Sequence, residues 1–309
     1  MTWDDALDGY WLEKRRGFSP NTVRGYGNVF RLFGGFVGHE REFTKITAVD
    51  VRKFLNAMAD EREWSDKTAL NAWIALSSMW SWAEMELGTP HVIRGKVTKP
   101  RWRRPQVEPY SEEEVAKLLF MCEHNASWKT RSAKVWVKSR RPTMLRDRAM
   151  VLTLLDTGLR AQELCDLKLA DYDRQSGRLR VLHGKGDKQR FVFAGEVCRK
   201  AIWRYLVERG QTMPDAALFG GRAGQHLERK NLGRLLRTMA KRALIANVTV
   251  HRFRHTFAIQ FLRNGGNVLA LQELLGHEKL DTVKIYARLA QVDLQAAQMR
   301  ASPADNWKL

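Results

Sequence analysis

Apolar residues recur at helical spacing through the first ninety residues, and each run is bounded by residues that begin or end helices. The first run ends near Arg15–Gly17, and the second follows a Ser-Pro pair, which is an N-cap with proline at the first helical position. Two more runs begin near Thr47 and Ser65. Because amphipathic helices bury their apolar faces by packing together, the sequence predicts a four-helix bundle over residues 1–92.

A basic, proline-containing segment follows the bundle, and we assign residues 93–109 to an interdomain linker. From Arg94 to Arg104 the segment has no acidic residue and six basic ones, which are Arg94, Lys96, Lys99, Arg101, Arg103 and Arg104. Proline and like-charge repulsion keep such a segment extended. An extended basic strap can follow a DNA backbone, although a plain solvated linker fits the same pattern.

The third part, residues 110–309, begins with a capping box at Ser111. Apolar residues recur at helical spacing through most of it, which predicts helices. Its one clear β-signal is an alternating pattern over residues 178–193, interrupted by a Gly- and Asp-containing turn, which indicates an antiparallel hairpin. Residues 124–148 are basic and without sustained periodicity, so we interpret them as a surface loop that ends at a helix near Thr143. The sequence therefore predicts a mainly α protein with a small antiparallel sheet.

Composition favours a polyanionic partner. The 309 residues include 53 Lys and Arg against 34 Asp and Glu, for a formal net charge of +19. Such an excess, spread along the chain, favours nucleic acid, although a merely basic protein is the alternative. The cysteines at 122, 165 and 198 lack Cys-x-x-Cys spacing, which argues against a disulfide framework or a zinc ribbon. The N-terminal residues do not have the pattern of a signal peptide, and no apolar run approaches the length of a membrane span. We expect a soluble cytoplasmic protein without a metal site.

Residues suited to chemistry on a phosphate gather near the C-terminus. His251 and Arg254 form a His-x-x-Arg pair, His277 stands in a Leu-Gly-His sequence, and Tyr286 follows nine residues later. Arginine can clamp phosphate oxygens, histidine can move a proton, and tyrosine can be the nucleophile. Each residue taken alone is more often structural; their joint occurrence carries the interpretation.

Two further candidates lie upstream. Arg160 begins a short helix, where backbone N–H groups add to its charge, and Glu163 one turn later can hold its guanidinium in place. Lys185 stands at the tip of the predicted hairpin, a position from which it could reach a bound phosphate.

These residues occur in the order seen in the tyrosine recombinase (phage integrase) family, which the sequence resembles over essentially its whole length. The motifs are Thr157-Gly158-Leu159-Arg160 with Glu163, Gly184-Lys185-Gly186, His251 through Phe257, Leu275-Gly276-His277, and Tyr286. The resemblance, closest to the two-domain Xer-like members, implies a SAM-like core-binding bundle and a catalytic domain of the DNA breaking-rejoining type. The longer loop at residues 124–148 and the C-terminal ASPADNWKL sequence depart from compact members, and an additional arm-binding domain is not expected.

By resemblance, Tyr286 forms a 3′-phosphotyrosine, His251 accepts its proton, and Lys185 protonates the leaving 5′-oxygen. Arg160 and Arg254 would clamp the non-bridging oxygens, with a hydrogen bond from His277 and support from Glu163. Such a reaction requires no metal, cofactor or ATP. His255 is interpreted as structural.

The expected partners are double-stranded DNA at specific sites, further copies of the chain in a tetramer, and an accessory DNA-bending or directionality factor. Lys188 and Arg252 join the strap as candidate DNA contacts. The tail after Tyr286 packs either on a neighbouring subunit or on its own domain. A type IB topoisomerase-like activity and a catalytically silent DNA-binding protein are the alternatives. The sequence does not separate a mobile-element integrase from a dimer resolvase, although the basic loop at residues 124–148 favours the mobile element.

Overall fold

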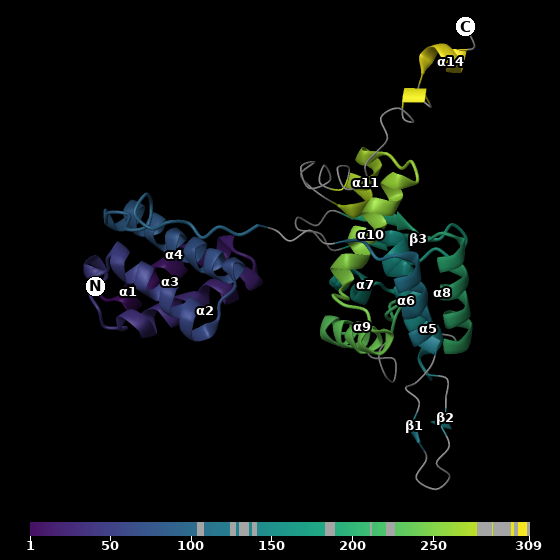
Figure 1. The fold of residues 1–309 in the computed structure, drawn as a ribbon, viewed down its shortest axis with the longest axis horizontal. Helices are drawn as coiled ribbons and strands as arrows, with labels where there is room; N and C mark the ends of the chain where they lie inside the picture. Colours follow the sequence, from purple (N-terminus) through teal and green to yellow (C-terminus); the bar gives the residue numbers. More distant parts are fainter. Residues whose placement is uncertain are drawn as a thin grey trace. The chain divides into compact units, whose positions relative to one another are not determined.

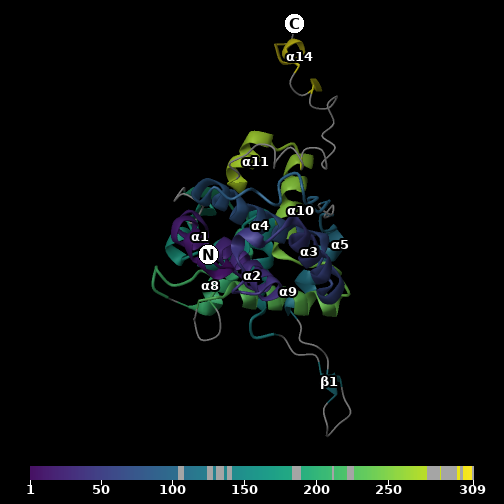
Figure 2. The ribbon, with the colours of Figure 1, turned by 90° about the vertical axis from the view of Figure 1, so that its left-hand side faces the viewer.

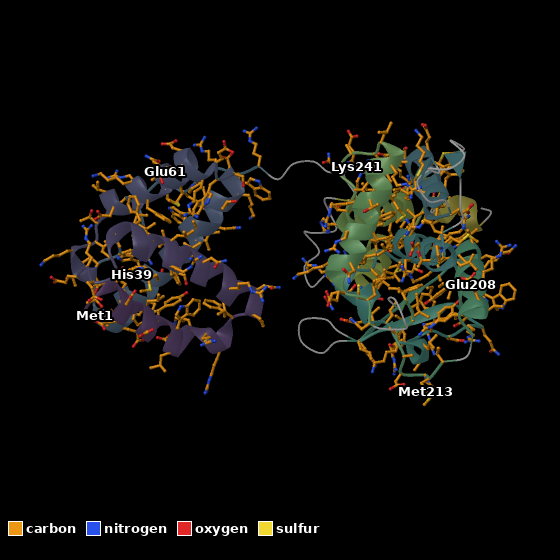
Figure 3. All side chains as sticks on the ribbon, turned by 90° about the horizontal axis from the view of Figure 1, so that it is seen from below. Met1, His39, Glu61, Glu208, Met213 and Lys241 are labelled. Carbon is orange, nitrogen blue, oxygen red and sulfur yellow. The ribbon has the colours of Figure 1, made fainter. Side chains whose placement is uncertain are left out.

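The structure is a computed structural model that describes most of the chain. The described residues are 1–103, 108–123, 128–129, 136–137, 141–182, 189–210, 212–220, 226–276, 286, 298–299 and 302–307. The chain divides into two compact units, Met1–Pro105 and Gln106–Leu309. Side chains fill the interior of each unit separately (Figure 3), so each has its own hydrophobic core.

The N-terminal unit is the predicted four-helix bundle (Figure 2). Its elements are α1 (Trp3–Lys14), the 3-10 turn η1 (Arg15–Gly17), α2 (Pro20–Val37), η2 (Phe43–Lys45), α3 (Ala48–Arg62) and α4 (Asp66–Leu87). Ser19, Thr47 and Ser65 each accept a hydrogen bond from a first-turn amide, as the sequence predicts for N-caps. Gly88 ends α4 in the left-handed conformation.

Aromatic side chains build the core of this unit. Trp3 and Phe33 pack edge to face with ring centroids 5.0 Å apart, and Phe43 stacks on Trp80 at 5.3 Å. All four are fully buried. The interpretation of the tryptophans on these helices as core residues is thus confirmed for Trp80 and for Trp82, which is 4% exposed.

The first residues assigned to the linker belong to this bundle instead. Ile93 and Val97 are buried in its core, and the carbonyl of Ile93 accepts hydrogen bonds from the Lys96 and Val97 amides. The Trp73 indole donates to the carbonyl of Val97 at 3.2 Å. Residues 93–97 therefore form a turn that packs on α4, because the apolar side chains of Ile93 and Val97 are buried in the core of the bundle.

The C-terminal unit is mostly helical (Figure 1). Its helices are α5 (Glu112–Glu123), α6 (Met144–Thr157), α7 (Ala161–Asp166), α8 (Glu196–Arg209), α9 (Arg229–Ala243), α10 (Val250–Arg263), α11 (Val268–Leu275) and α14 (Pro303–Trp307), with a 3-10 turn η3 (Leu169–Asp171). Its strands are β1 (Trp128–Lys129), β2 (Trp136–Val137), β3 (Arg178–Val181) and β4 (Arg190–Phe193). The predicted capping box of α5 is present, with reciprocal hydrogen bonds between Ser111 and Glu114.

Helix α6 lies in the middle of this unit, packed against α5, α8 and α10 (Figure 1). The predicted hairpin is confirmed: β3 and β4 pair antiparallel with Arg178 opposite Phe193 and Val181 opposite Arg190. The segment 124–148 differs from the expected loop, because β1 and β2 form a short antiparallel ladder within it. Alternation over two residues per strand is too short to appear as a periodic pattern.

Arg252, expected to contact DNA, is a structural residue of this unit. It is 9% exposed, and its guanidinium lies 4.1 Å from the centre of the Tyr110 ring. It forms a two-pronged ion pair with Glu114 at 3.1 and 2.7 Å, and donates to three backbone carbonyls as well. These contacts with α5 and the segment before it, far away in sequence, favour a structural role for Arg252 over the expected DNA contact.

We predict that Arg252→Met destabilises the protein by about 3 kcal/mol, because Glu114 and the three carbonyls lose their donor. Arg148→Met is the matched control, since it breaks a partly exposed pair with Glu123 and should cost less than about 1 kcal/mol. Urea unfolding of both variants measures the difference. If Arg252→Met had normal stability and weakened DNA binding, Arg252 would be a DNA contact and not a structural residue.

Candidate active site

Helix α10 presents two of the candidate catalytic residues. Its N-cap, Thr249, accepts a hydrogen bond from the Arg252 amide, and the Tyr110 hydroxyl accepts one from the Thr249 amide at 3.0 Å. This fixed helix start places His251 at the surface and Arg254, one turn later, in the interior with 2% exposure. The His-x-x-Arg spacing thus separates an accessible imidazole from a buried guanidinium.

Arg254 joins the ends of two other helices. Its Nη1 donates to the Gly158 carbonyl at 2.9 Å, just after α6, and its Nη2 donates to the Leu275 carbonyl at 2.6 Å, at the end of α11. Burial lowers the pKa of the Arg254 guanidinium to about 10, and the positive charge of Arg160 acts in the same direction. Arg254 remains protonated at neutral pH, and a phosphate between the two arginines would relieve their repulsion.

Gly158 sets the path of the chain into Arg160. It adopts φ +61° after α6, and a Cβ there would lie 2.5 Å from the Phe257 ring and 3.0 Å from Leu275. Only glycine combines the left-handed conformation with this close approach. The turn brings Arg160, the residue before α7, to the same region as Arg254.

The predicted support of Arg160 by Glu163 is present. Nη1 of Arg160 donates to Oε1 of Glu163 at 2.7 Å, and the Arg160 amide donates to Oε2 at 2.8 Å. Arg190, from β4, approaches the same carboxylate with both Nη atoms, at 3.0 and 2.7 Å. Burial alone would raise the pKa of Glu163, but the Arg190 hydrogen bonds and charge, followed by those of Arg160, lower it to about 2. Arg190 was not among the site residues predicted from the sequence.

Tyr286 lies beside His255 of α10. Its side chain is 3% exposed and belongs to an apolar cluster with Ile259 and Leu271. Its ring centre is 5.1 Å from that of His255, which is 4.5 Å from that of His251. The two histidines and the candidate nucleophile therefore form a continuous row of rings, and His255 occupies its buried centre.

Four candidate residues lie outside the described part of the chain: Arg104, Lys185, Lys188 and His277. Within the described part, no group of His, Cys, Asp and Glu residues could hold a metal ion. The helices that can be assessed there include none long and apolar enough to cross a membrane.

A cavity of about 600 Å³ adjoins the candidate catalytic groups. Arg160, His251 and Arg254 contribute to its lining. Its opposite wall is the basic face of α9, which contributes Arg229, Lys230, Arg234 and Arg237. The sequence contains the pattern that predicts this basic face. Helix α9 carries six basic residues and no acidic one, and it is strongly amphipathic.

Comparison with known proteins places these observations in a family. Residues 112–292 match the Phage integrase family, and residues 12–87 match the phage integrase N-terminal SAM-like domain. The chain belongs to the phage integrase family. Its Arg160, His251, Arg254 and Tyr286 all fall within the first match, which spans more than half of the sequence.

Curated relatives of this family member are tyrosine recombinases. Tyrosine recombinase XerC of Pelobacter propionicus is 30% identical over 302 residues, covering 94% of this chain and 92% of the relative. XerC of Leptospira interrogans is 28% identical, with coverage of 95% and 91%. XerD of Listeria innocua is 27% identical, with coverage of 97% and 99%. The phage integrase chain described here is therefore a tyrosine site-specific recombinase, and the topoisomerase alternative is not favoured.

Solved structures agree on the fold. A λ integrase dimer bound to a COC′ core site has a TM-score of 0.71 at 18% identity, covering 91% of this chain and 97% of that one. XerH recombinase bound to a palindromic difH substrate has a TM-score of 0.68 at 21% identity, with coverage of 95% and 82%. Both confirm the predicted fold class.

We predict that Glu163→Gln lowers stability at neutral pH by about 3 kcal/mol, because the folded pKa of Glu163 lies near 2 and its ordinary value is 4.5. A depressed folded pKa contributes stability that is fully present above pH 4.5 and is lost as pH falls toward 2. The wild type and Glu163→Gln should therefore converge across this window.

Thermal unfolding between pH 7 and pH 2 measures the convergence. Glu113→Gln is the control, because Glu113 pairs with Lys117 on the surface, and it should change the melting temperature little. Equal effects of the two substitutions would show that the Glu163 carboxylate does not stabilise the folded state.

Proposed function

We propose that this protein cleaves and rejoins DNA at specific sites through a covalent 3′-phosphotyrosine at Tyr286. The observation that carries the proposal is the convergence of Arg160 and Arg254, from separate parts of the chain, on one cavity with His251. Two guanidiniums held together beside an imidazole form an anion site suited to a phosphodiester. Tyr286, joined to this group through the ring of His255, is the nucleophile.

In the cleavage step, the Tyr286 Oη–phosphorus bond forms as the bond from phosphorus to the 5′-oxygen breaks. The phenol proton passes to His251, and Lys185 supplies the proton that the leaving 5′-oxygen takes. Arg160 and Arg254 neutralise the charge that grows on the non-bridging oxygens, with a hydrogen bond from His277. Attack by a 5′-hydroxyl of another strand reverses the same steps, so the bond energy is kept and ATP is not needed.

The guanidiniums take the charge-neutralising part that a metal ion has in other phosphoryl-transfer enzymes, so no metal is assigned a role. The required compartment is the one that holds the DNA, which we infer to be the cytoplasm with its nucleoid.

We propose a DNA surface on each unit: the cavity and α9 on the C-terminal unit, and the basic strap on the N-terminal unit. The exposed side chains of Arg229, Lys230, Arg234 and Arg237 would contact the backbone near the reacting phosphate. On the N-terminal unit, Arg94, Lys96, Lys99, Arg101 and Arg103 of the strap remain candidates, and Arg104 and Lys188 extend this set. Lys99 lies 5.7 Å from the Trp73 ring centre, and Lys67 lies 4.3 Å from that of Trp102, so part of the strap is already ordered on α4.

Strand exchange requires two sites, and we propose that several copies of the chain assemble on paired DNA, as a tetramer. The λ integrase and XerH structures, a dimer on a core site and a recombinase on its difH substrate, support a DNA-bound assembly. The C-terminal tail is the proposed contact between neighbours, and an accessory DNA-bending or directionality factor is a further partner.

We predict that the wild type forms a covalent adduct on a nicked suicide duplex and that Tyr286→Phe forms none, because the substituted ring lacks the attacking oxygen. Duplexes from the flanks of the gene's own locus serve as substrates, in EDTA without added metal. A denaturing gel detects the protein–DNA adduct.

Tyr172→Phe is the matched control, since Tyr172 is a buried tyrosine of the same unit away from the site, and it should leave the adduct intact. Adducts that require two paired sites support a recombinase, whereas relaxation of plasmid by single molecules supports a topoisomerase-like enzyme. An adduct with Tyr286→Phe would assign the nucleophile elsewhere.

We also predict that Arg234→Ala lowers the slope of log K against log salt for duplex binding by about 1, because it removes one phosphate contact. Lys200→Ala is the control, an exposed basic residue of α8, and should leave the slope unchanged. Fluorescence anisotropy with any duplex gives both slopes. Equal slopes for Arg234→Ala and wild type would remove α9 from the interface.

A further inference from the structure

We infer that Arg190 is a positioning residue that keeps the charge of Arg160 available to the reacting phosphate, an inference that rests on the proposed function. Glu163 fixes Arg160 but would also neutralise it. Arg190 supplies the compensating charge from β4, across 27 residues of sequence.

The geometry of the carboxylate supports this assignment. Each oxygen of Glu163 accepts two hydrogen bonds, one from Arg160 and one from Arg190. Glu163 and Arg190 have side chains only 4% and 12% exposed, whereas the Arg160 side chain is 45% exposed. The buried guanidinium thus meets the carboxylate with both Nη atoms, and the exposed one uses a single Nη and retains its outer edge.

Charge counting gives the consequence. Arg160, Arg254 and Arg190 carry three positive charges, and Glu163 carries one negative charge, so the cluster has a net charge of two. A phosphodiester carries one negative charge, and its five-coordinate transition state carries two. The charge of the cluster equals that of the transition state in magnitude only while Arg190 is present. Without Arg190, Glu163 would cancel the charge of one of the two arginines that bind the phosphate.

Arg190 also reaches the third segment of the site. Its Nε donates to the Leu274 carbonyl at 2.8 Å, next to the Leu275 carbonyl that Arg254 binds. A Cβ on Gly276 would lie 3.1 Å from the Arg190 side chain. Arg190 therefore ties β4 to α7 and to the end of α11, and its position is set from both sides.

The test uses the duplex that the wild type traps covalently and measures single-turnover cleavage. Arg190→Met should lower the rate about 100-fold, because it removes one unit of charge from the clamp. Arg190→Lys, which keeps charge but loses the planar two-pronged contact, should lose about 10-fold. The Arg190→Met/Glu163→Gln double variant restores the net charge of two and should be about 10-fold faster than Arg190→Met alone.

A neutral substrate separates charge from folding. With a methylphosphonate at the scissile position, the transition state carries one negative charge, so Arg190→Met should lose less than about 10-fold relative to wild type. A merely structural role would give the same loss on both substrates. Arg180→Met is the control, because Arg180, on β3 of the same hairpin, pairs with buried Asp171 of η3 away from the site. This variant should cleave at the wild-type rate.

A second measurement needs no DNA. Inorganic sulfate should raise the melting temperature of the wild type and of the double variant more than that of Arg190→Met, with Arg180→Met following the wild type. A double variant as slow as Arg190→Met, with the same sulfate response, would overturn the role of Arg190. Wild-type protein that traps no DNA yet shows the expected sulfate pattern would overturn the proposed function and leave the charge arrangement standing.

Discussion

The carboxylate of Glu163 is the interaction on which the active-site region depends. It accepts hydrogen bonds from two guanidiniums, those of Arg160 and Arg190, and a third, that of Arg254, is close enough for its pKa to respond to Arg160. Like charges at such separations repel strongly when water is excluded. The buried Glu163 carboxylate accepts four hydrogen bonds and so holds the guanidiniums in place before a phosphate binds. Little reorganisation of these charges is then needed during the reaction.

Helix ends provide the second source of negative potential. Arg254 donates to the carbonyls of Gly158 and Leu275, and Arg190 donates to that of Leu274; all three carbonyls stand where α6 or α11 ends. Both helices end at a left-handed glycine, which leaves these carbonyls facing the guanidiniums instead of a continuing helix. The glycines of the Thr-Gly-Leu-Arg and Leu-Gly-His sequences are therefore part of the arrangement of charge.

Short-range physics made much of this predictable. Caps, helical stripes and the Arg160–Glu163 pair involve residues within a few positions of one another, and the strands of the β3–β4 hairpin follow one another in the chain. The sequence therefore displays these features directly. The sequence did not predict the contacts of Arg190 and Arg252, because their partners lie in distant segments: Glu163 for the first, Glu114 and Tyr110 for the second. A lone arginine in a basic protein has the same local pattern whether it meets DNA or a buried carboxylate. The burial of Ile93 and Val97 likewise depends on α4, which the pattern of the strap does not reveal.

A preorganised cluster of positive charge must be stabilised by something other than its own interactions. In the C-terminal unit that stabilisation comes from the apolar environment of α6, whose residues from Ala149 to Leu154 are all buried and which packs against α5, α8 and α10. Helix α6 ends at Gly158, so the same packing that fills the core also fixes the carbonyl that Arg254 binds. Gly158 therefore links the packing of the core to the position of the Arg254 charge. Loosening α6 would therefore displace the carbonyl that Arg254 binds and the turn to Arg160 together.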